Sequence, residues 1–235
     1  MSTLFKKFPI IFIFSQFLIS QQPILKLYLS FDEGDGTEAS DKGSGLIATL
    51  NNCEWVQGVK GKALLFNGKD SYVRVQESQS IDFLRTLDGP FTMEAWFRPS
   101  KFFEENYRQT AEIINTGSGR GPGYRIIFSW RMVYFTTGDG QNDWYISTKY
   151  PQHKIELENW NHIAVVRNTN NILIMYFNGN EASRSTNTFQ VTDGNRDITI
   201  GSYYSTAVYM FQGVIDEVKI FQGAKTAAEI MKSAR

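Results

Sequence analysis

A single carboxylate interrupts an apolar stretch near the end of the sequence, in the run Gly213-Val-Ile-Asp-Glu-Val-Lys-Ile-Phe. Read as an alternating strand, the run has one face made of Val214, Asp216, Val218 and Ile220. Its other face consists of Ile215, Glu217, Lys219 and Phe221. A carboxylate on a mostly apolar face is costly unless it is paired, hydrogen-bonded or bound to a cation. Asp216 therefore predicts that the final strand helps to anchor an ion.

Aromatic and polar side chains gather between residues 120 and 145, where they could bind a ligand. The aromatic members are Tyr124, Trp130, Tyr134, Trp144 and Tyr145, and the polar members are Arg120, Arg125, Asp139, Asn142 and Asp143. Rings with an apolar face suit the flat side of a sugar, while polar side chains pair with its hydroxyls. We expect a ligand platform formed by Arg120, Tyr124, Trp130, Asp139, Asn142 and Trp144. The alternative is that most of these rings pack in the core. Tyr203 and Tyr204 form a second candidate surface pair.

Other chemistries have little support in the sequence. His153 and His162 are the only histidines, and neither stands in a motif with a Ser or Cys nucleophile. Two separated histidines also make a poor zinc site. The glycine-rich run 117–123 lacks the Gly-Lys-Ser/Thr ending of a phosphate loop.

Composition excludes two further classes. The chain has 24 basic and 24 acidic residues and no basic stripe, so a nucleic-acid partner is not expected. Cys53 is the only cysteine, which excludes an intramolecular disulfide and a thiolate zinc cluster.

The first residues resemble a secretory signal. Lys6 and Lys7 precede the apolar run 8–19, and the small residue Ser20 follows it. The run is shorter than the roughly 20 apolar residues of a membrane span, although an uncleaved anchor is the alternative. We expect residues 1–20 to be a signal peptide and the protein to be secreted, with no membrane span after cleavage.

Short alternating runs with turn signals between them fill the rest of the chain. About a dozen such runs predict an all-β protein, a sandwich or a barrel. The only helical candidate is the segment 226–235. Because no linker or repeat divides the region, residues 21–235 are expected to form one domain.

Five segments carry a family resemblance in their order and spacing. They are Leu27-Tyr-Leu-Ser-Phe-Asp-Glu-Gly-Asp-Gly-Thr with Asp41-Lys-Gly-Ser-Gly, Gly58-Val-Lys-Gly-Lys-Ala-Leu-Leu-Phe-Asn-Gly, Phe91-Thr-Met-Glu-Ala-Trp-Phe-Arg-Pro, Trp160-Asn-His-Ile-Ala-Val-Val-Arg with Tyr176-Phe-Asn-Gly, and the closing stretch 213–230. Together they resemble the laminin G-like (LamG-like), concanavalin A-like jelly-roll domains. The resemblance implies two antiparallel sheets stacked face to face, one of them concave.

The resemblance also implies a structural calcium ion that joins the two ends of the domain. Asp32 and Asp216 occupy the family positions for such a site, Gly34 could add a carbonyl, and Asn67 or Asp70 could add a side-chain oxygen. The alternative is that the two aspartates accept hydrogen bonds from turn amides.

A glycosidase on this fold would need two facing carboxylates. Glu94 is the only acid inside its aromatic strand, and alternation points Asp216 and Glu217 to opposite faces. We therefore expect a non-enzymatic module that recognises a glycan or a protein at the cell surface or in the extracellular matrix. A polysaccharide hydrolase or lyase is the second hypothesis, and a matrix component that associates through strand edges is the third.

Overall fold

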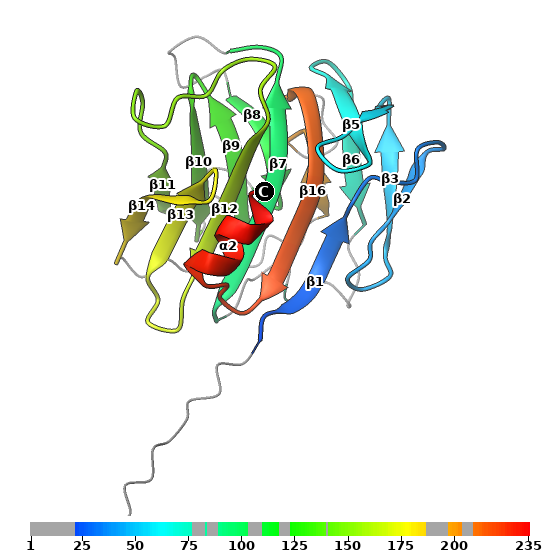
Figure 1. The fold of residues 1–235 in the computed structure, drawn as a ribbon. Coiled ribbons are helices and arrows are strands. Elements are labelled where there is room, and N and C mark those ends of the chain that lie inside the picture. Colours follow the sequence, from blue (N-terminus) through cyan, green and yellow to red (C-terminus); the bar gives the residue numbers. More distant parts are fainter. Residues whose placement is uncertain are drawn as a thin grey trace, which may run out of the picture.

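Alternating apolar residues build two antiparallel β-sheets that stack face to face in the computed structural model (Figure 1). The structure describes residues 22–76, 83, 89–102, 110–117, 123–139, 141–186, 197–203 and 209–235. Its architecture confirms the predicted all-β sandwich with a short C-terminal helix. The expected signal peptide, residues 1–20, lies outside the described residues.

The first sheet contains the first and last strands of the described chain side by side. In spatial order it consists of β14 (Asn180–Ser185), β13 (Leu173–Phe177), β12 (Asn161–Arg167), β7 (Phe91–Pro99), β16 (Gln212–Gln222), β5 (Lys62–Asn67) and β4 (Glu54–Gln57). Strand β1 (Ile24–Leu29) also pairs with β16, as Figure 1 shows. The ends of the domain meet at β16, as expected from the sequence.

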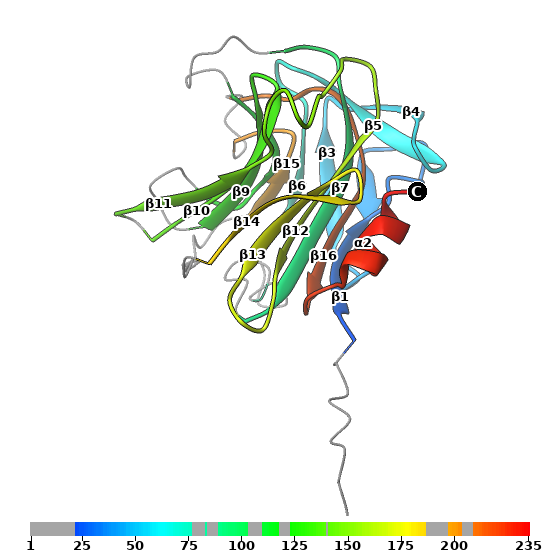
Figure 2. The same cartoon turned by 60° about the vertical axis from the view of Figure 1, so that its left-hand side comes forward.

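The second sheet lies behind the first. Its spatial order is β11 (Asp143–Ser147), β10 (Met132–Gly138), β9 (Gly123–Ser129), β8 (Thr110–Asn115), β15 (Ile198–Ile200), β6 (Tyr72–Val75), β3 (Ile47–Asn51) and β2 (Glu38–Ser40). Figure 2 shows β9, β10 and β11 together at the left-hand side of the molecule. Their exposed face forms the candidate binding site.

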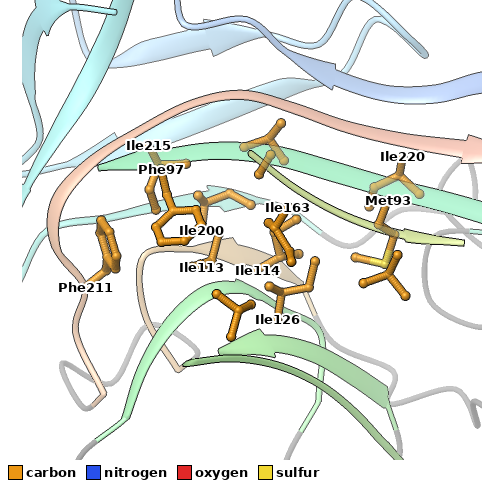
Figure 3. Packing of buried hydrophobic residues seen from close by; sticks show 14 of the residues in the cluster. Met93, Phe97, Ile113, Ile114, Ile126, Ile163, Ile200, Phe211, Ile215 and Ile220 are labelled. Atoms are coloured by element: carbon orange, nitrogen blue, oxygen red, sulfur yellow. The ribbon is translucent and has the colours of Figure 1, made fainter. Parts of the chain in front are cut away.

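One apolar core fills the space between the sheets. The first sheet contributes Met93, Phe97, Ile163, Ile215 and Ile220, and the second contributes Ile113, Ile114, Ile126 and Ile200 (Figure 3). Phe211 lies at one end of this cluster and packs edge-on against Phe66 and Phe97. Burial of such side chains is the main favourable contribution to folding.

A bulge in β16 changes the faces predicted for the final strand. Asp216 lies opposite Trp96, but Lys219 lies opposite Glu94, so β16 carries an extra residue between these pairs. Glu217 takes up the extra length at φ +54°. After the bulge, Val218 and Ile220 join Ile215 in the core rather than sharing the face of Asp216. The prediction that strict alternation separates Asp216 from Glu217 is therefore wrong.

The C-terminal helix α2 (Ala227–Ser233) lies on the outer face of the first sheet (Figure 1). Thr226 and Glu229 form a capping box, which defines the start of the helix. Ile230 is fully buried in a second apolar cluster with residues of β12 and β13. The predicted helix is thus confirmed, with Thr226 as its N-cap.

A buried polar cluster lies beneath α2. Lys225 Nζ donates to Glu94 Oε1 at 2.6 Å and to Ser233 Oγ at 3.0 Å. His162 Nε2 lies 3.7 Å from Glu94 Oε2. Burial alone raises the pKa of Glu94, but the nearby His162 imidazole and the Lys225 ammonium group outweigh it and bring the pKa down to about 2. Glu94 therefore helps to hold the helix on the sheet. The cluster belongs to the first sheet.

Candidate functional site

A groove of about 740 Å³ crosses the face of the second sheet that points away from the core. Its floor includes Arg125, Ile127 and Ser129, the residues of β9 that alternate with core residues. Hydroxyl groups of Thr136 and Ser147, on β10 and β11, also line it. The groove follows from β-alternation, because one face of each strand fills the core and the other remains available.

Tyrosine rings stand on both sides of this floor. Tyr134 and Tyr145 come from β10 and β11, with ring centroids 6.1 Å apart. Tyr203 and Tyr209, on the connection between β15 and β16, meet edge to face at 5.5 Å. Tyr145 is 64% exposed and Tyr209 is 41% exposed. The groove is therefore lined by rings that have solvent-facing surface to offer a ligand.

The charged group in the groove is Arg125, which pairs with a buried acid. Its Nη1 lies 3.2 Å from Glu112 Oε1, and its Nε donates to Thr136 Oγ1 at 3.3 Å. Glu112, on β8, has no exposed surface. Burial raises the pKa of Glu112 to about 7, against the opposing effects of Arg125 and Asn115. The Glu112 carboxyl group can therefore gain or lose a proton near neutral pH.

The structure corrects two of the predicted ligand residues. Tyr124 is only 1% exposed and lies in the core, where its ring stacks on Phe135. Trp144 is half-buried and packs against the same core. Tyr124 and Trp144 stand at the positions of their strands that point toward the core. The next residue in each strand points the other way, so Arg125 and Tyr145 line the groove instead.

Of the four other residues predicted to bind the ligand, Trp130, Asp139 and Asn142 stand at turns. Trp130 occupies the β9–β10 turn and packs against Tyr150, with ring centroids 4.9 Å apart. Asp139 Oδ1 accepts hydrogen bonds from the amides of Gln141 and Asn142, which closes the β10–β11 turn. None of these predicted turn residues lines the groove. Arg120 lies outside the described residues.

A signal for the correct face was present in the sequence. Val133 and Phe135 alternate with Tyr134 and Thr136, so an apolar core set would have assigned Tyr134 to the opposite face. The sequence held no comparable signal that Glu112 would pair with a residue of the groove. Glu112 lies opposite Ile127, and a bulge between Glu112 and Ile114 then shifts the register of the rest of β8 against β9.

The two aspartates predicted to bind calcium converge on one turn. Asp216 Oδ2 accepts hydrogen bonds from the amides of Val59 and Lys60, at 2.9 and 3.2 Å. Asp32 Oδ1 accepts one from the amide of Lys62 at 3.1 Å. The turn that joins β4 to β5 is thus fastened to β16 at one point and to the end of β1 at another. This is the turn-amide alternative described for these residues.

The bulge in β16 adds Glu217 to the same side. Tyr28 OH donates to Glu217 Oε1 at 2.7 Å, and Lys219 Nζ donates to Oε2 at 2.6 Å. Lys60 Nζ lies 3.6 Å from the same Oε2 atom. The charge of Glu217 is therefore balanced by two lysines, and its carboxylate also links β16 to β1 and to the β4–β5 turn.

Several oxygens around this turn suit a cation. Asp216 Oδ1 is buried and has no hydrogen-bond partner among the described residues. A Cβ built on Gly58 would lie 2.5 Å from both Asp216 Oδ2 and the Lys62 carbonyl oxygen, and 2.8 Å from the Lys60 carbonyl oxygen. Gly34, with φ +82°, lies nearby, since a Cβ there would be 3.7 Å from Lys62 Cγ. Burial raises the pKa of Asp216 to about 7, so a cation would compete with a proton for this carboxylate.

Asn67 does not belong to this group of oxygens. It pairs with Gln212, four residues along β16 from Asp216, which corresponds to about 13 Å of extended strand. Its Oδ1 accepts hydrogen bonds from the amides of Lys69 and Asp70 in a separate turn. The prediction that Asn67 adds an oxygen to the cation site is corrected. Among the described residues, no group of three or more His, Cys, Asp or Glu side chains is arranged for a metal ion.

Comparison with known proteins supports the fold. A family model described as the concanavalin A-like lectin/glucanases superfamily matches residues 67–231, more than half of the chain. No curated protein matches the sequence. Within the described ranges, no helix has the length and apolar character needed to cross a membrane.

Three solved structures illustrate the likeness. The binding domain of Paraclostridial Mosquitocidal Protein 1 has a TM-score of 0.70 at 18% identity, over 89% of this chain and 51% of that one. Domain 4 of AbnA, a GH43 extracellular arabinanase from Geobacillus stearothermophilus in complex with arabinotriose, has a TM-score of 0.68 at 21% identity, over 92% of this chain and 100% of that one. The botulinum neurotoxin serotype G binding domain has a TM-score of 0.68 at 18% identity, over 89% of this chain and 50% of that one.

The chain thus spans about half the length of the two toxin domains and the whole of the arabinanase domain. At these identities the likeness is one of fold, and it confirms the predicted jelly-roll sandwich.

Proposed function

Because the chain belongs to the concanavalin A-like lectin/glucanase superfamily, we propose that it is a secreted, non-enzymatic module that binds a glycan in the tyrosine-lined groove. The target would be a glycan at a cell surface or in the extracellular matrix. The signal-like residues 1–20 support secretion, and the complex of the related arabinanase domain with arabinotriose supports a sugar ligand.

The observation that carries the proposal is the composition of the groove. Its volume of about 740 Å³ lies within the range of pockets that hold small ligands. Exposed rings at Tyr145 and Tyr209 offer apolar faces, and hydroxyls of Thr136 and Ser147 offer hydrogen bonds. Rings with polar edges suit a ligand that has both apolar faces and many hydroxyl groups.

A polysaccharide hydrolase or lyase is the second candidate. The observation in its favour is Glu112, whose pKa of about 7 suits a general acid. Its carboxyl group has no exposed surface, however, and the groove-lining residues that the structure describes include no carboxylate. Glycoside hydrolysis uses two carboxyl groups on either side of the bond. The groove therefore supports binding better than cleavage.

We also propose a structural calcium ion at the β4–β5 turn. Asp32 and Asp216 would supply carboxylate oxygens, and the carbonyls of Lys60, Lys62 and Gly34 would supply the oxygens that calcium prefers besides carboxylates. The unpartnered Asp216 Oδ1 supports this site. The ion would replace the lost hydration of that carboxylate.

Calcium can be tested by thermal unfolding in calcium and in chelator. A ligand at a hundred times its dissociation constant stabilises the fold by about 2.7 kcal/mol, so the unfolding temperature should rise in calcium. Asp216→Ala should abolish the rise, whereas Asn67→Ala should keep it, because Asn67 caps a different turn. Equal unfolding temperatures in calcium and chelator would exclude the ion.

Binding can be tested on a glycan array with the wild-type chain and two tyrosine variants. Tyr145→Ala should weaken every glycan signal, because it removes the most exposed ring of the groove. Tyr150→Ala is the matched control, since Tyr150 is exposed but packs against Trp130 outside the groove. Release of products from a polysaccharide panel would instead support the enzyme. A folded protein that binds no glycan would refute the proposal.

A further inference from the structure

The charge of the groove rests on one pair of residues. Among the described residues that line the groove, Arg125 is the only charged one. Its partner Glu112, on the neighbouring strand β8, is fully buried and meets Arg125 through Oε1 alone. The net charge presented to a ligand therefore depends on whether Glu112 carries a proton.

Arg125 has donors to spare for a ligand. A guanidinium group has five N–H donors. The described residues take two of them, one at Glu112 and one at Thr136. Because the Arg125 side chain keeps 15% of its surface exposed on the groove floor, the remaining donors can reach a ligand oxygen. A planar fork of this kind matches carboxylate and sulfate groups.

Glu112 is held in a setting where its charge is poorly compensated. Its Oε2 atom is buried and has no hydrogen-bond partner among the described residues. Asn115, on the same strand, is the neutral polar neighbour that acts on its pKa. Another ion pair of this sheet joins Arg74 to Asp197. Arg125 is therefore the one charge known to act on Glu112 within the described residues.

We propose that the groove recognises an anionic glycan, one that carries a carboxylate or a sulfate, and that Glu112 takes up a proton as the anion binds Arg125. This inference rests on the proposed function of the same groove. With Glu112 ionised, Arg125 is already neutralised from below. With Glu112 protonated, Arg125 presents an unshared positive charge to the ligand.

The size of the effect follows from the titration of Glu112. Its pKa of about 7 means that the carboxyl group is mostly protonated at pH 5.5 and about one-tenth protonated at pH 8. If the anion binds only the protonated form, its affinity should be about tenfold lower at pH 8 than at pH 5.5. A neutral glycan has no reason to distinguish the two forms of Glu112.

The test uses calorimetric titration of the full chain at about pH 5.5 and about pH 8. The probes are a galacturonate trisaccharide, its fully methyl-esterified neutral form, and a sulfated heparin tetrasaccharide. The carboxylate and sulfate probes stay ionised over this range, so any proton taken up must come to the protein. Repeating the titration in buffers of different ionisation enthalpy counts that proton.

We expect the anionic probe to bind about tenfold more tightly at the lower pH, with uptake of close to one proton at pH 8. Heparin carries both carboxylate and sulfate groups, so binding of galacturonate shows that a carboxylate is enough, whereas binding of heparin alone shows that a sulfate is needed. Tight proton-linked binding of either probe supports the inference. Glu112→Gln should bind the anion equally well at both pH values and take up no proton. Arg125→Met should lose the preference for the anionic form over the methyl ester.

Glu181→Gln is the matched control, because Glu181 pairs with Arg184 on the other sheet. It should keep the wild-type dependence on pH. Binding of the neutral ester as tightly as the acid, with no change between the two pH values, would overturn the inference and leave glycan binding intact. Binding of no probe by a folded protein would overturn both the inference and the proposed function.

Discussion

Replacing Lys225 by methionine should leave a buried carboxylate without its main partner. In the folded protein Glu94 is only 2% exposed, and Lys225 Nζ donates to it at 2.6 Å. Methionine keeps most of the length and apolar surface of lysine but supplies neither charge nor donor. The variant therefore isolates the polar contact from the packing of the side chain.

The expected loss is about 3–5 kcal/mol of unfolding free energy, the usual result of removing one partner of a buried ion pair. The pKa of Glu94 gives an independent value. Its fall from 4.5 to about 2 on folding corresponds to about 3 kcal/mol at neutral pH. In the wild type this contribution is present above pH 4.5 and is lost as the pH falls through about 2.

The sign of the pH dependence reverses in the variant. Without Lys225, burial should dominate and raise the pKa of Glu94, so the ionised carboxylate becomes destabilising. The deficit of Lys225→Met against the wild type should be largest near neutral pH and should shrink as the pH falls toward 4, where Glu94 becomes protonated. The double variant Glu94→Gln/Lys225→Met should recover part of the loss, because it removes the buried carboxylate together with its lysine partner.

Urea unfolding at several pH values measures these differences by linear extrapolation. Lys232→Met is the matched control, because Lys232 is an exposed lysine of the helix that Lys225 precedes, and its effect should stay within about 0.5 kcal/mol. A loss below about 1 kcal/mol for Lys225→Met, or a double variant as unstable as the single one, would refute this account of the cluster.

Three further outcomes are expected. Since the pKa of Glu112 is raised to about 7, the wild type should lose stability as the pH rises from about 5 to 8. In urea unfolding, Glu112→Gln should lack about 2–3 kcal/mol of that decline. Parallel pH profiles of the two proteins would contradict the assignment. Gly58→Ala should cost about 1–3 kcal/mol in the same assay, because its Cβ would lie 2.5 Å from Asp216 Oδ2; a neutral effect would show that the turn is free to move. Tyr124→Ala should cost about 3–5 kcal/mol of stability, because its ring is buried in the core. Tyr145→Ala should leave the unfolding temperature nearly unchanged and weaken glycan binding. The reverse pattern would mean that the faces of β9 and β11 are exchanged.

Most of the fold could be predicted from the sequence because alternation and turn residues are local signals. The apolar runs in β7, β12 and β13 each fill a strand, and Thr226 with Glu229 indicates where the helix begins. These patterns depend on neighbours within a few residues. The two-sheet arrangement then follows from the need to bury one face of each sheet.

The candidate site was harder to predict because it depends on which face of its strand each residue occupies and on where the strands bulge. A strand with aromatic residues on both faces, such as β11 with Trp144 and Tyr145, does not indicate which ring faces the core until its partners are known. The bulge at Glu217 reverses the assignment of every later residue in β16. The convergence of Asp32 and Asp216 on one turn was expected from the family resemblance, whereas the amides that they bind belong to a turn about 30 and 156 residues away.

The position of β16 has a consequence for the order in which the molecule can assemble. This strand lies between β7 and β5 and also pairs with β1, so without it the first sheet would divide into two pieces with unpaired edges and leave β1 without a partner strand. During synthesis, β1, β5 and β7 emerge early and must wait for their shared partner until residues 212–222 leave the ribosome. Such long-range pairing slows folding, and a nascent or truncated chain that ends before Gln212 should be held by chaperones or aggregate rather than form half of a sandwich.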